Sequence, residues 1–380
     1  SGWITTGPVT RDLEKKIQEY IGAGPVLCLN AWTNAVELML RWYGVGEDDE
    51  VIIPAYTYAA TANIVMHVGA KPVMVDTEAN SFLLDLQQVK KMISPKTKVI
   101  MHVDFSGLPV DYHAVMELAK EHQEIFVANS EAQKRLGRIL VISDAAHSFG
   151  ALCNNKPVGG EVDVAAFSFH AVKNFTTAEG GALVFNLPAP FDNQAIWKEI
   201  NTKALHGQTK DAFSKTQAGQ WQYDIVEAGY KCNMTDIQAA IGWVEMDRYA
   251  QDHLPRRKEI VSKYNELFSD HEDLILPLFK VAERESSYHL YPLRIKGFGE
   301  EQRNQLITAL ALKGISTNVH FQPLPRLTFY KNLGYIESDY PHAMAQFANE
   351  ISLPVYFDLS DEDVIFIAHS LLEEIKVIKQ

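Results

Sequence analysis

The chain has 380 residues, of which 47% are hydrophobic and 22% are charged, and its formal net charge is −13. This acidity argues against nucleic acid as a partner, because phosphate backbones are bound by clustered lysine and arginine. No apolar run reaches the roughly 18 residues that a membrane helix needs, and the first residues show no signal-peptide pattern. The length exceeds what one hydrophobic core usually supports, so we expect two domains.

The three cysteines lie far apart and form no CxxC pair: Cys28, Cys153 and Cys232. This pattern predicts a reducing compartment, with neither a disulfide framework nor a zinc site built on cysteines. We therefore expect a cytoplasmic protein without a bound metal.

Apolar segments of strand length alternate with helical patterns along the first 150 residues. Strands are expected at residues 25–29, 51–54, 71–76, 97–103 and 138–143, and helices at residues 11–21, 35–42, 59–67, 86–92 and 111–122. This alternation predicts an α/β fold in which helices cover a mostly parallel sheet. The polar segment 130–137 is expected to be a surface insertion.

Two further strands, at residues 164–169 and 182–185, enclose a polar turn, and a helix is expected at 192–206. Residues 207–222 have few apolar side chains and predict an exposed loop. A long helix is expected to begin after a capping box of Thr235 and Gln238 and to reach about residue 268. Pro255 either kinks this helix or separates two helices.

The pattern changes after Pro277. Strands are expected at residues 288–295 and 315–321, and helices at 300–313, 343–351 and 361–378. Strands of antiparallel character followed by terminal helices are typical of a smaller α+β domain. We therefore place a large domain at residues 1–245 and a small C-terminal domain at residues 246–380.

In a parallel sheet the ligand sits beyond the carboxyl ends of the strands, so functional residues should follow the strands. The polar side chains at these positions include Tyr58, Asp144, His147, Ser168 and Lys173. After the first strand, Thr33 and Asn34 open a helix, whose free N–H groups can bind an anion. The alternative for Thr33 or Asn34 is an ordinary helix cap.

Pyridoxal 5′-phosphate requires a set of groups of this kind. Its aldehyde needs a lysine such as Lys173, and its pyridine nitrogen needs a carboxylate such as Asp144. Its phosphate needs small hydroxyls and backbone donors, and its ring needs an aromatic platform such as Tyr58. Singly, each residue has a plainer explanation as a cap, a solvated lysine or a structural histidine. The order of these residues along the chain carries the inference.

In this order the chain resembles the sugar aminotransferases of the DegT/DnrJ/StrS group, within the aspartate-aminotransferase-like fold type I. The resemblance covers nearly the whole chain and rests on the segments WITTGP (3–8), IIPAYTYAATANIVMHVGAKPVMVD (52–76), SDAAHSFGA (143–151), SFHAVKNFTTAEGGALVFN (168–186) and GYKCNMTDIQAAIG (229–242). Two positions depart from the family pattern, because Trp32 and Ala178 stand where glycine is usual or frequent. The first segment normally lies further inside such proteins, so we expect a piece to precede Ser1.

The resemblance implies a pyridoxal phosphate-dependent aminotransferase. Lys173 is then implied to form a Schiff base with the cofactor and to carry the proton between cofactor and substrate. Asp144 is implied to pair with the pyridinium nitrogen, His147 to lie by the ring or its 3′-oxygen, and Tyr58 to stack on the ring.

The resemblance also assigns the phosphate contacts. Thr33, Asn34 and Ser168 are implied to hold the phosphate of the chain's own cofactor. Asn233, together with Lys231, is implied to reach the phosphate in a neighbouring subunit. This last contact implies an obligate homodimer with active sites at its interface.

The family further implies that glutamate donates the amino group, through the pyridoxamine form of the cofactor, to a keto sugar on a nucleoside diphosphate. A 4-keto-6-deoxy sugar is the first candidate, in polysaccharide, O-antigen or other glycoconjugate biosynthesis. Candidates for sugar and diphosphate contacts are His320, Tyr330 and the loop 207–222. For His320, a structural role in a strand is an equal alternative.

Other functions remain open at this point. The related sugar 3-dehydratases have histidine where this chain has Lys173, which argues against dehydration. An aminotransferase acting on a keto-inositol, or an aminohydroxybenzoate-type synthase, would use the same cofactor site. A regulatory or sensor protein could also bind a ligand on this fold without turnover.

Overall fold

The computed structural model describes residues 2–209 and 222–380. A seven-stranded sheet lies at the centre of the larger part, with the strand order β1-β9-β8-β5-β4-β2-β3. Strands β2, β3, β4, β5 and β8 are mutually parallel, and β9 pairs antiparallel with both β8 and β1. The strands are β1 (Val26–Leu29), β2 (Glu50–Pro54), β3 (Lys71–Val75), β4 (Thr97–Val103), β5 (Leu140–Asp144), β8 (Val164–Ser168) and β9 (Gly181–Phe185).

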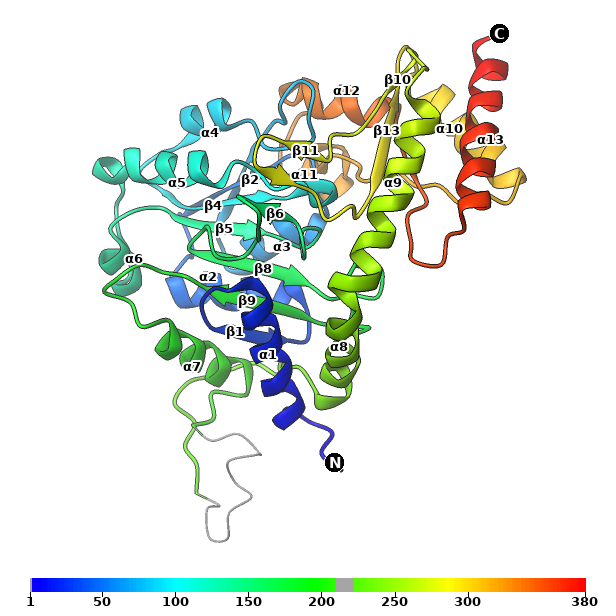
Figure 1. Cartoon of the computed structure of the whole chain (residues 1–380). Helices are drawn as coiled ribbons and strands as arrows, with labels where there is room; N and C mark the ends of the chain where they lie inside the picture. The colour runs from blue at the N-terminus through cyan, green and yellow to red at the C-terminus, as the bar shows by residue number, and fades with distance from the viewer. Residues whose placement is uncertain (1, 210–221) are drawn as a thin grey trace.

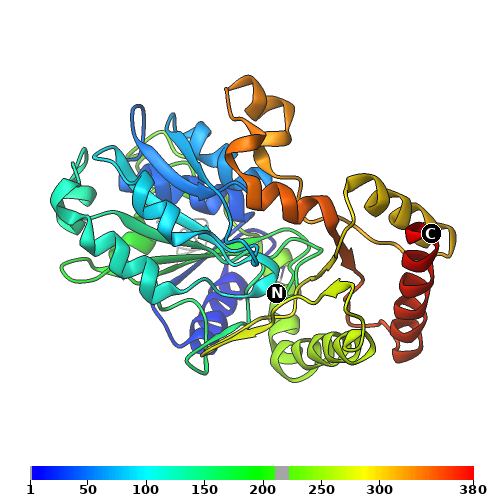
Figure 2. The same cartoon turned by 90° about the horizontal axis from the view of Figure 1, so that it is seen from above.

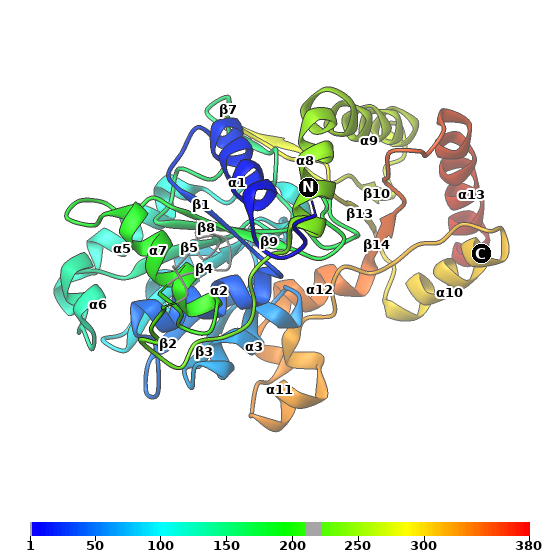
Figure 3. The same ribbon diagram turned by 90° about the horizontal axis from the view of Figure 1, so that it is seen from below.

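Helices cover both faces of this sheet. Figure 3 shows α1 and α8 side by side on one face, and α2 and α3 on the other. Asp236, at the start of α8, accepts hydrogen bonds from the backbone N–H groups of Gly7 and Thr10 at 2.8 and 3.0 Å, and so caps α1. The helices of this part are α1 (Pro8–Ile21), α2 (Trp32–Tyr43), α3 (Ala59–His67), α4 (Leu86–Met92), α5 (Tyr112–Glu121), α6 (Glu131–Leu136), α7 (Asn193–Ala204) and α8 (Asp236–Arg248).

A long rod leads from the large sheet to the C-terminal part. It consists of α8, a π-helical turn (Tyr249–His253) and α9 (Leu254–Phe268), with Pro255 in the first turn of α9 (Figure 1). The C-terminal part contains the three-stranded sheet β10-β13-β14, which Figure 2 shows between α9 and the helices α10 and α13. Its elements are β10 (Leu274–Ile275), β13 (Tyr291–Ile295), α10 (Glu300–Leu312), α11 (Thr328–Asn332), α12 (Pro341–Asn349), β14 (Glu350–Leu353) and α13 (Asp361–Lys379).

Short strands from both parts pair with one another. The four-stranded sheet β11-β12-β6-β7 joins β6 (Leu152–Cys153) and β7 (Lys156–Pro157) to β11 (Lys280–Val281) and β12 (Arg284–Glu285). Two clusters of buried apolar side chains follow the same division, one around the large sheet and one between α9, β13, α10 and α13. Helix α11 nevertheless packs with the larger cluster, beside α3. The predicted division between residues 245 and 246 falls within α8 and stays a prediction.

The predicted mixed α/β sheet and most predicted elements are confirmed. The helix at 59–67, the helix at 86–92 and the strand at 97–103 have the expected bounds, and the Thr235–Gln238 capping box is present. The predicted strand at 315–321 is wrong, because this segment makes only the isolated bridge Asn318↔Ser352. The predicted helix at 343–351 is wrong at its end, because α12 ends at Asn349 and residues 350 and 351 belong to β14.

The segment 130–137 lies at the surface, as predicted, but it is helical. It forms helix α6, which Ser130 caps and Gly137 ends. Its Gln133 is fully buried and donates hydrogen bonds to the carbonyl oxygens of Tyr43 and Gly44. None of the helices in residues 2–209 and 222–380 is long and apolar enough to cross a membrane.

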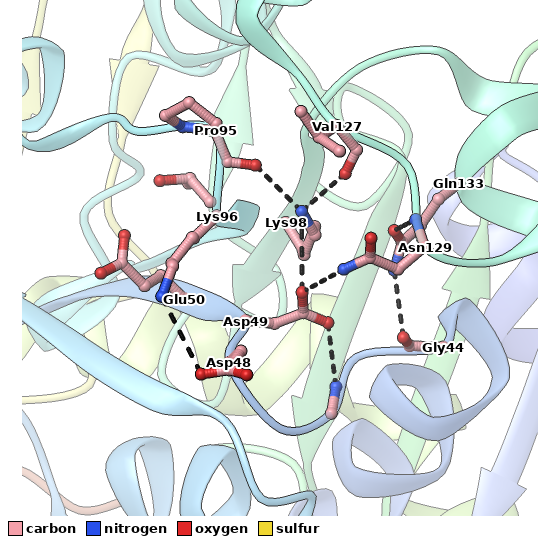
Figure 4. A network of polar contacts seen from close by, with 12 residues as sticks. Gly44, Asp48, Asp49, Glu50, Pro95, Lys96, Lys98, Val127, Asn129 and Gln133 are labelled. Atoms are coloured by element: carbon pink, nitrogen blue, oxygen red, sulfur yellow. Dashed lines mark hydrogen bonds and ion pairs between the residues drawn. The ribbon is translucent and has the colours of Figure 1, made fainter.

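A buried lysine organises the amino ends of the strands. Figure 4 shows Lys98, at the start of β4, pointing at Asp49, with 3.6 Å between Nζ and Oδ1. Lys98 also donates to the carbonyl oxygens of Pro95 and Val127 at 3.0 and 2.6 Å. Asn129 donates to Asp49 at 2.7 Å, so both charges are partnered although both side chains are buried. Breaking such a buried pair from one side leaves a charge without compensation.

We predict that Lys98→Met lowers the free energy of unfolding by about 3 kcal/mol, because Asp49 is then buried without its cation. Urea denaturation measures the change. Lys96→Met is the matched control, because Lys96 and Asp48 form an exposed pair at 3.9 Å that contributes little. Equal effects of the two substitutions would contradict this explanation.

Candidate active site

A cavity of about 400 Å³ opens at the carboxyl ends of β4, β5 and β8. The last residue of each of these strands lines it: Val103, Asp144 and Ser168. The turn after β8, the start of α2, the start of α3 and the segment before α11 supply the other walls. Among the lining residues are Trp32, Thr33, Thr57, Tyr58, Thr61, His147, His170, Lys173, Glu179, His289, His320 and Phe321.

Asp144 is a buried carboxyl with few partners. Its Oδ2 accepts a hydrogen bond from the Thr61 hydroxyl at 2.9 Å, and its Oδ1 accepts one from the N–H of Ala146 at 3.2 Å. Burial raises the pKa of Asp144 to about 6, against the lowering effects of these bonds and of Lys173. A cationic N–H group bound in the cavity would therefore lower the pKa of Asp144 and stabilise its ionised form.

Lys173 lies in the turn between β8 and β9. Its backbone N–H donates to the carbonyl of His170 at 2.9 Å, which fixes the turn, and its side chain lines the cavity. Burial lowers the pKa of the Lys173 amine to about 8, and the nearby Asp144 opposes this shift. A substantial fraction of this amine is then neutral near physiological pH, which a nucleophile or a general base requires.

No side chain caps the start of α2 among the residues the structure describes. Its N-cap is Ala31, which has no capping side chain, so the first N–H groups of the helix remain available beside the cavity. Gly181 allows β9 to approach this point, because a Cβ there would lie 2.4 Å from the backbone nitrogen of Trp32. The buried indole N–H of Trp32 has no hydrogen-bond partner within the described ranges. With the hydroxyls of Thr33 and Ser168, the first N–H groups of α2 form a site suited to an anion.

Two histidines lie against each other on one wall. The ring centroids of His147 and His289 are 4.4 Å apart, and burial lowers the pKa of both. His147 accepts the N–H of Ser106 at its Nδ1 (3.3 Å), so its proton is on Nε2. Nδ1 of His289 contacts Oδ1 of Asn174 at 2.7 Å, and an amide oxygen only accepts, so this nitrogen carries the proton.

The structure brings most of the predicted site residues to one cavity: Thr33, Tyr58, Asp144, His147, Ser168, Lys173 and His320. Tyr58 is 64% exposed, and its ring lies 5.7 Å from that of Phe321. Ala178, in the turn after Lys173, has a φ of +66°, a conformation that favours glycine.

Four predicted residues do not line this cavity: Asn34, Tyr330, Asn233 and Lys231, which lies against Asn233. Asn34 donates its amide to Asn30 at 2.8 Å. Tyr330 is buried, and its hydroxyl donates to Asn63 of α3 at 2.6 Å. Asn233 donates to the Thr6 hydroxyl at 2.6 Å, outside the cavity of its own chain. Most of the predicted loop 207–222 lies outside the described residues.

Thr61, His289 and Phe321 line the cavity and were not predicted from the sequence. For Thr61 a signal existed, because it lies one helical turn after Tyr58, on the same side of α3. His289 and Phe321 come from segments more than 100 residues away from Lys173, and no local pattern connects them to it.

Together these residues fit pyridoxal phosphate. The cavity offers an amine with a lowered pKa, a carboxyl with a raised pKa and a cluster of free anion donors at a helix start. Within residues 2–209 and 222–380, no cluster of three histidine, cysteine or carboxylate side chains could hold a metal ion.

Comparison with known proteins identifies the family. The model of the DegT/DnrJ/EryC1/StrS aminotransferase family matches residues 1–372, and the chain belongs to this family. The chain is 37% identical over 374 residues to the uncharacterized protein MJ1066 of Methanocaldococcus jannaschii, covering 98% of this chain and 91% of that protein. It is 34% identical over 381 residues to SpsC of Bacillus subtilis, a spore coat polysaccharide biosynthesis protein, covering 99% of this chain and 92% of SpsC.

The fold is shared with solved aminotransferase structures. Spr1654 from Streptococcus pneumoniae, which is assigned as a sugar aminotransferase, is 45% identical in its PMP form, with a TM-score of 0.96. The match covers 100% of this chain and 94% of Spr1654. The same protein has also been solved in its PLP form.

We predict that Asp144 makes the stability of the cofactor-free protein depend on pH. Its folded-state pKa of about 6 is raised above the ordinary value of 3.8 for an aspartate, so the stabilisation is complete below about pH 4 and is lost as the pH rises through about 6. The loss is on the order of 3 kcal/mol. The free energy of unfolding is measured by urea denaturation at several pH values from 4 to 7. Between these limits it should fall further in the wild type than in Asp144→Asn, and the difference should equal this loss. Parallel curves for the two proteins would contradict the prediction.

Proposed function

We propose that this chain is a pyridoxal phosphate-dependent aminotransferase that moves an amino group from glutamate to a nucleotide-linked keto sugar. A 4-keto-6-deoxy sugar is the first candidate, for polysaccharide, O-antigen or other glycoconjugate biosynthesis in the cytoplasm. The observation that carries the proposal is the convergence of Lys173 and Asp144 in one cavity beside the uncapped start of α2. The family, and the likeness to SpsC and Spr1654, support the sugar as substrate class.

Bound pyridoxal phosphate would supply an aldehyde that takes up an amine and a ring that accepts electrons from the neighbouring carbon. The first N–H groups of α2 would hold the phosphate together with Thr33, Asn34 and Ser168. The positive end of the helix dipole and the side-chain donors both stabilise a negative charge at this place. Asn34 would have to release Asn30 to take part.

The ring contacts follow from the other walls. Asp144 would hold the proton on the ring nitrogen, and its bond from Thr61 keeps the carboxylate aimed. Tyr58 would stack on the ring, and His147, with its proton on Nε2, would lie beside the ring or its 3′-oxygen. Lys173 would hold the cofactor through its aldehyde group, and its neutral amine would carry a proton between the substrate carbon and the cofactor.

Sugar and diphosphate contacts are proposed for His320, which lines the cavity, and for the segment around Tyr330. Tyr330 itself is buried, so its contribution would be to hold α11 against α3 through Asn63 unless this packing changes.

We predict that Lys173→Ala abolishes both turnover and the visible absorbance that added pyridoxal phosphate gives with the wild type, because Lys173 is the one lysine among the described residues that line the cavity. Lys156→Ala is the matched control, because Lys156 is exposed on β7, and it should retain both signals. A Lys173→Ala protein that keeps the absorbance and the activity would refute the assignment.

A half-reaction screen then identifies the acceptor. The enzyme is loaded with pyridoxal phosphate and bleached with glutamate, and nucleotide-linked 4-keto and 3-keto sugars are tested for recovery of the absorbance. Recovery with a keto-inositol alone would favour the cyclitol reaction. A protein that binds the cofactor but that no amino donor bleaches would favour a sensor.

We also propose an obligate homodimer in which Asn233 and Lys231 reach the partner's cofactor. Helix α8 has three exposed apolar residues: Ile237, Ile241 and Val244. Their exposed fractions are 59%, 42% and 55%. Residues at this spacing lie on one side of a helix, and exposed apolar patches often mark subunit contacts.

We predict that the double substitution Ile241→Asp with Val244→Asp yields monomers with little activity, because two charges would be buried in the interface. Light scattering coupled to size exclusion measures the mass. Val377→Asp, at an equally exposed valine on α13, is the control and should leave the dimer intact. A dimer that persists in the double variant would contradict this interface.

A further inference from the structure

A buried carboxyl is connected to the cavity through one hydroxyl. Glu350, the first residue of β14, is fully buried, and the Ser352 hydroxyl lies 2.5 Å from its Oε1. The same Ser352 oxygen lies 2.9 Å from Nδ1 of His320, which lines the cavity. The backbone N–H of His320 donates to the other carboxyl oxygen, Oε2, at 3.1 Å. The three side chains therefore form a continuous chain from the core to the site.

This chain of hydrogen bonds has two consistent proton arrangements. When Glu350 is a carboxylate, both of its oxygens accept, and the Ser352 hydroxyl donates to one of them. The serine oxygen then accepts from Nδ1–H of His320, which leaves a lone pair on Nε2. When Glu350 is protonated, its O–H donates to Ser352, the serine donates to Nδ1, and the imidazole proton is on Nε2.

We propose that Glu350 and Ser352 are positioning residues that set the tautomer of His320, and so decide whether its Nε2 accepts or donates a hydrogen bond in the cavity. When Glu350 is a carboxylate, Nε2 of His320 would accept a hydrogen bond from a hydroxyl or amide N–H of the substrate. When Glu350 is protonated, Nε2–H would donate a hydrogen bond to a carbonyl or phosphate oxygen.

The surroundings of His320 and Glu350 make both arrangements accessible. Burial lowers the pKa of His320 to about 4, so its imidazole stays neutral and the tautomer is the relevant variable. Burial also raises the pKa of Glu350 to about 8, against the opposing effects of Ser352 and Arg303. Among the residues the structure describes, the only other hydrogen-bond contact of Nε2 is with Nδ2 of Asn318, a donor, at the long distance of 3.5 Å.

Other titratable or charged groups face Glu350 from each packed element. Arg303 comes from α10, Arg294 from the paired strand β13, and Tyr56 from the segment that follows β2. Arg303 and Arg294 stay cationic and Tyr56 stays neutral across pH 6 to 9, because burial raises the pKa of Tyr56 well above its usual value. Within this pH range Glu350 changes charge, and so does Lys173, which acts on His320 and whose pKa is about 8. Glu350→Gln removes the first titration and leaves the second in place, so this variant separates the two effects.

The first experiment reads the tautomer itself and needs no substrate. Protein labelled with ¹⁵N at histidine is followed by long-range ¹H–¹⁵N spectra from pH 6 to 9, and His320→Gln assigns the signal. The wild type should change from the Nε2–H to the Nδ1–H tautomer as the pH rises. Glu350→Gln should stay Nε2–H throughout, because its amide donates to Ser352 and its oxygen accepts from the His320 backbone.

The serine link is tested with two variants. Ser352→Ala should uncouple the His320 tautomer from pH, and Ser352→Thr, which keeps the hydroxyl, should restore the coupling. A single tautomer at every pH in the wild type, or an unchanged transition in Ser352→Ala, would overturn the proposal.

The second experiment concerns the substrate and rests on the proposed function. With the keto sugar found by the screen, Glu350→Gln should change KM for the sugar by several-fold at pH 8.5 and little at pH 6.5, with KM for glutamate unchanged. Equal changes for both substrates would assign Glu350 a purely structural role. If the wild type transfers no amino group, the proposed function fails, whereas the tautomer spectra still decide the role of Glu350 and Ser352.

Discussion

The parallel direction of β2, β4, β5 and β8 is the constraint on which the rest of this structure depends. Parallel strands all end at the same edge of a sheet, so residues far apart in the sequence meet there. Asp144 and Ser168 end neighbouring strands, and Lys173 follows in the next turn. The antiparallel return of β9 closes that turn, and Gly181 lets α2 begin directly beside it.

The two edges of the sheet treat buried charge differently. At the amino edge, Lys98 and Asp49 are paired with each other and with backbone and amide groups, which holds the loops together. At the carboxyl edge, Asp144 and Lys173 have fewer partners, and burial moves their pKa values toward each other. Buried charged groups with few partners are stabilised when a ligand supplies the missing partners. This property is expected of a binding site rather than of a structural ion pair.

Local patterns predicted most of the large part well, because its strands are continuous apolar segments buried on both faces and its helices bury one face each. The strand predicted at 315–321 failed for a tertiary reason. Its apolar residues pack between the two parts of the molecule, and only Asn318 bridges to β14. The segment 130–137 lies at the surface as its polar residues predicted, but its burial of Gln133, which donates to the carbonyl groups that end α2, was not predicted. Burial of a polar side chain depends on partners that only the fold supplies.

The sequence by itself determined the α/β class, the order of the elements and the set of residues around Lys173. These depend on periodicity and on motifs that lie close together along the chain. Only the tertiary structure decided that His289, Phe321 and Thr61 line the same cavity, that Tyr330 does not, and that Glu350 is connected to His320. It also showed that Lys173 is half-buried in the cavity wall, where loss of solvent lowers its pKa to about 8. Such properties arise from contacts between distant segments, which a linear pattern does not encode.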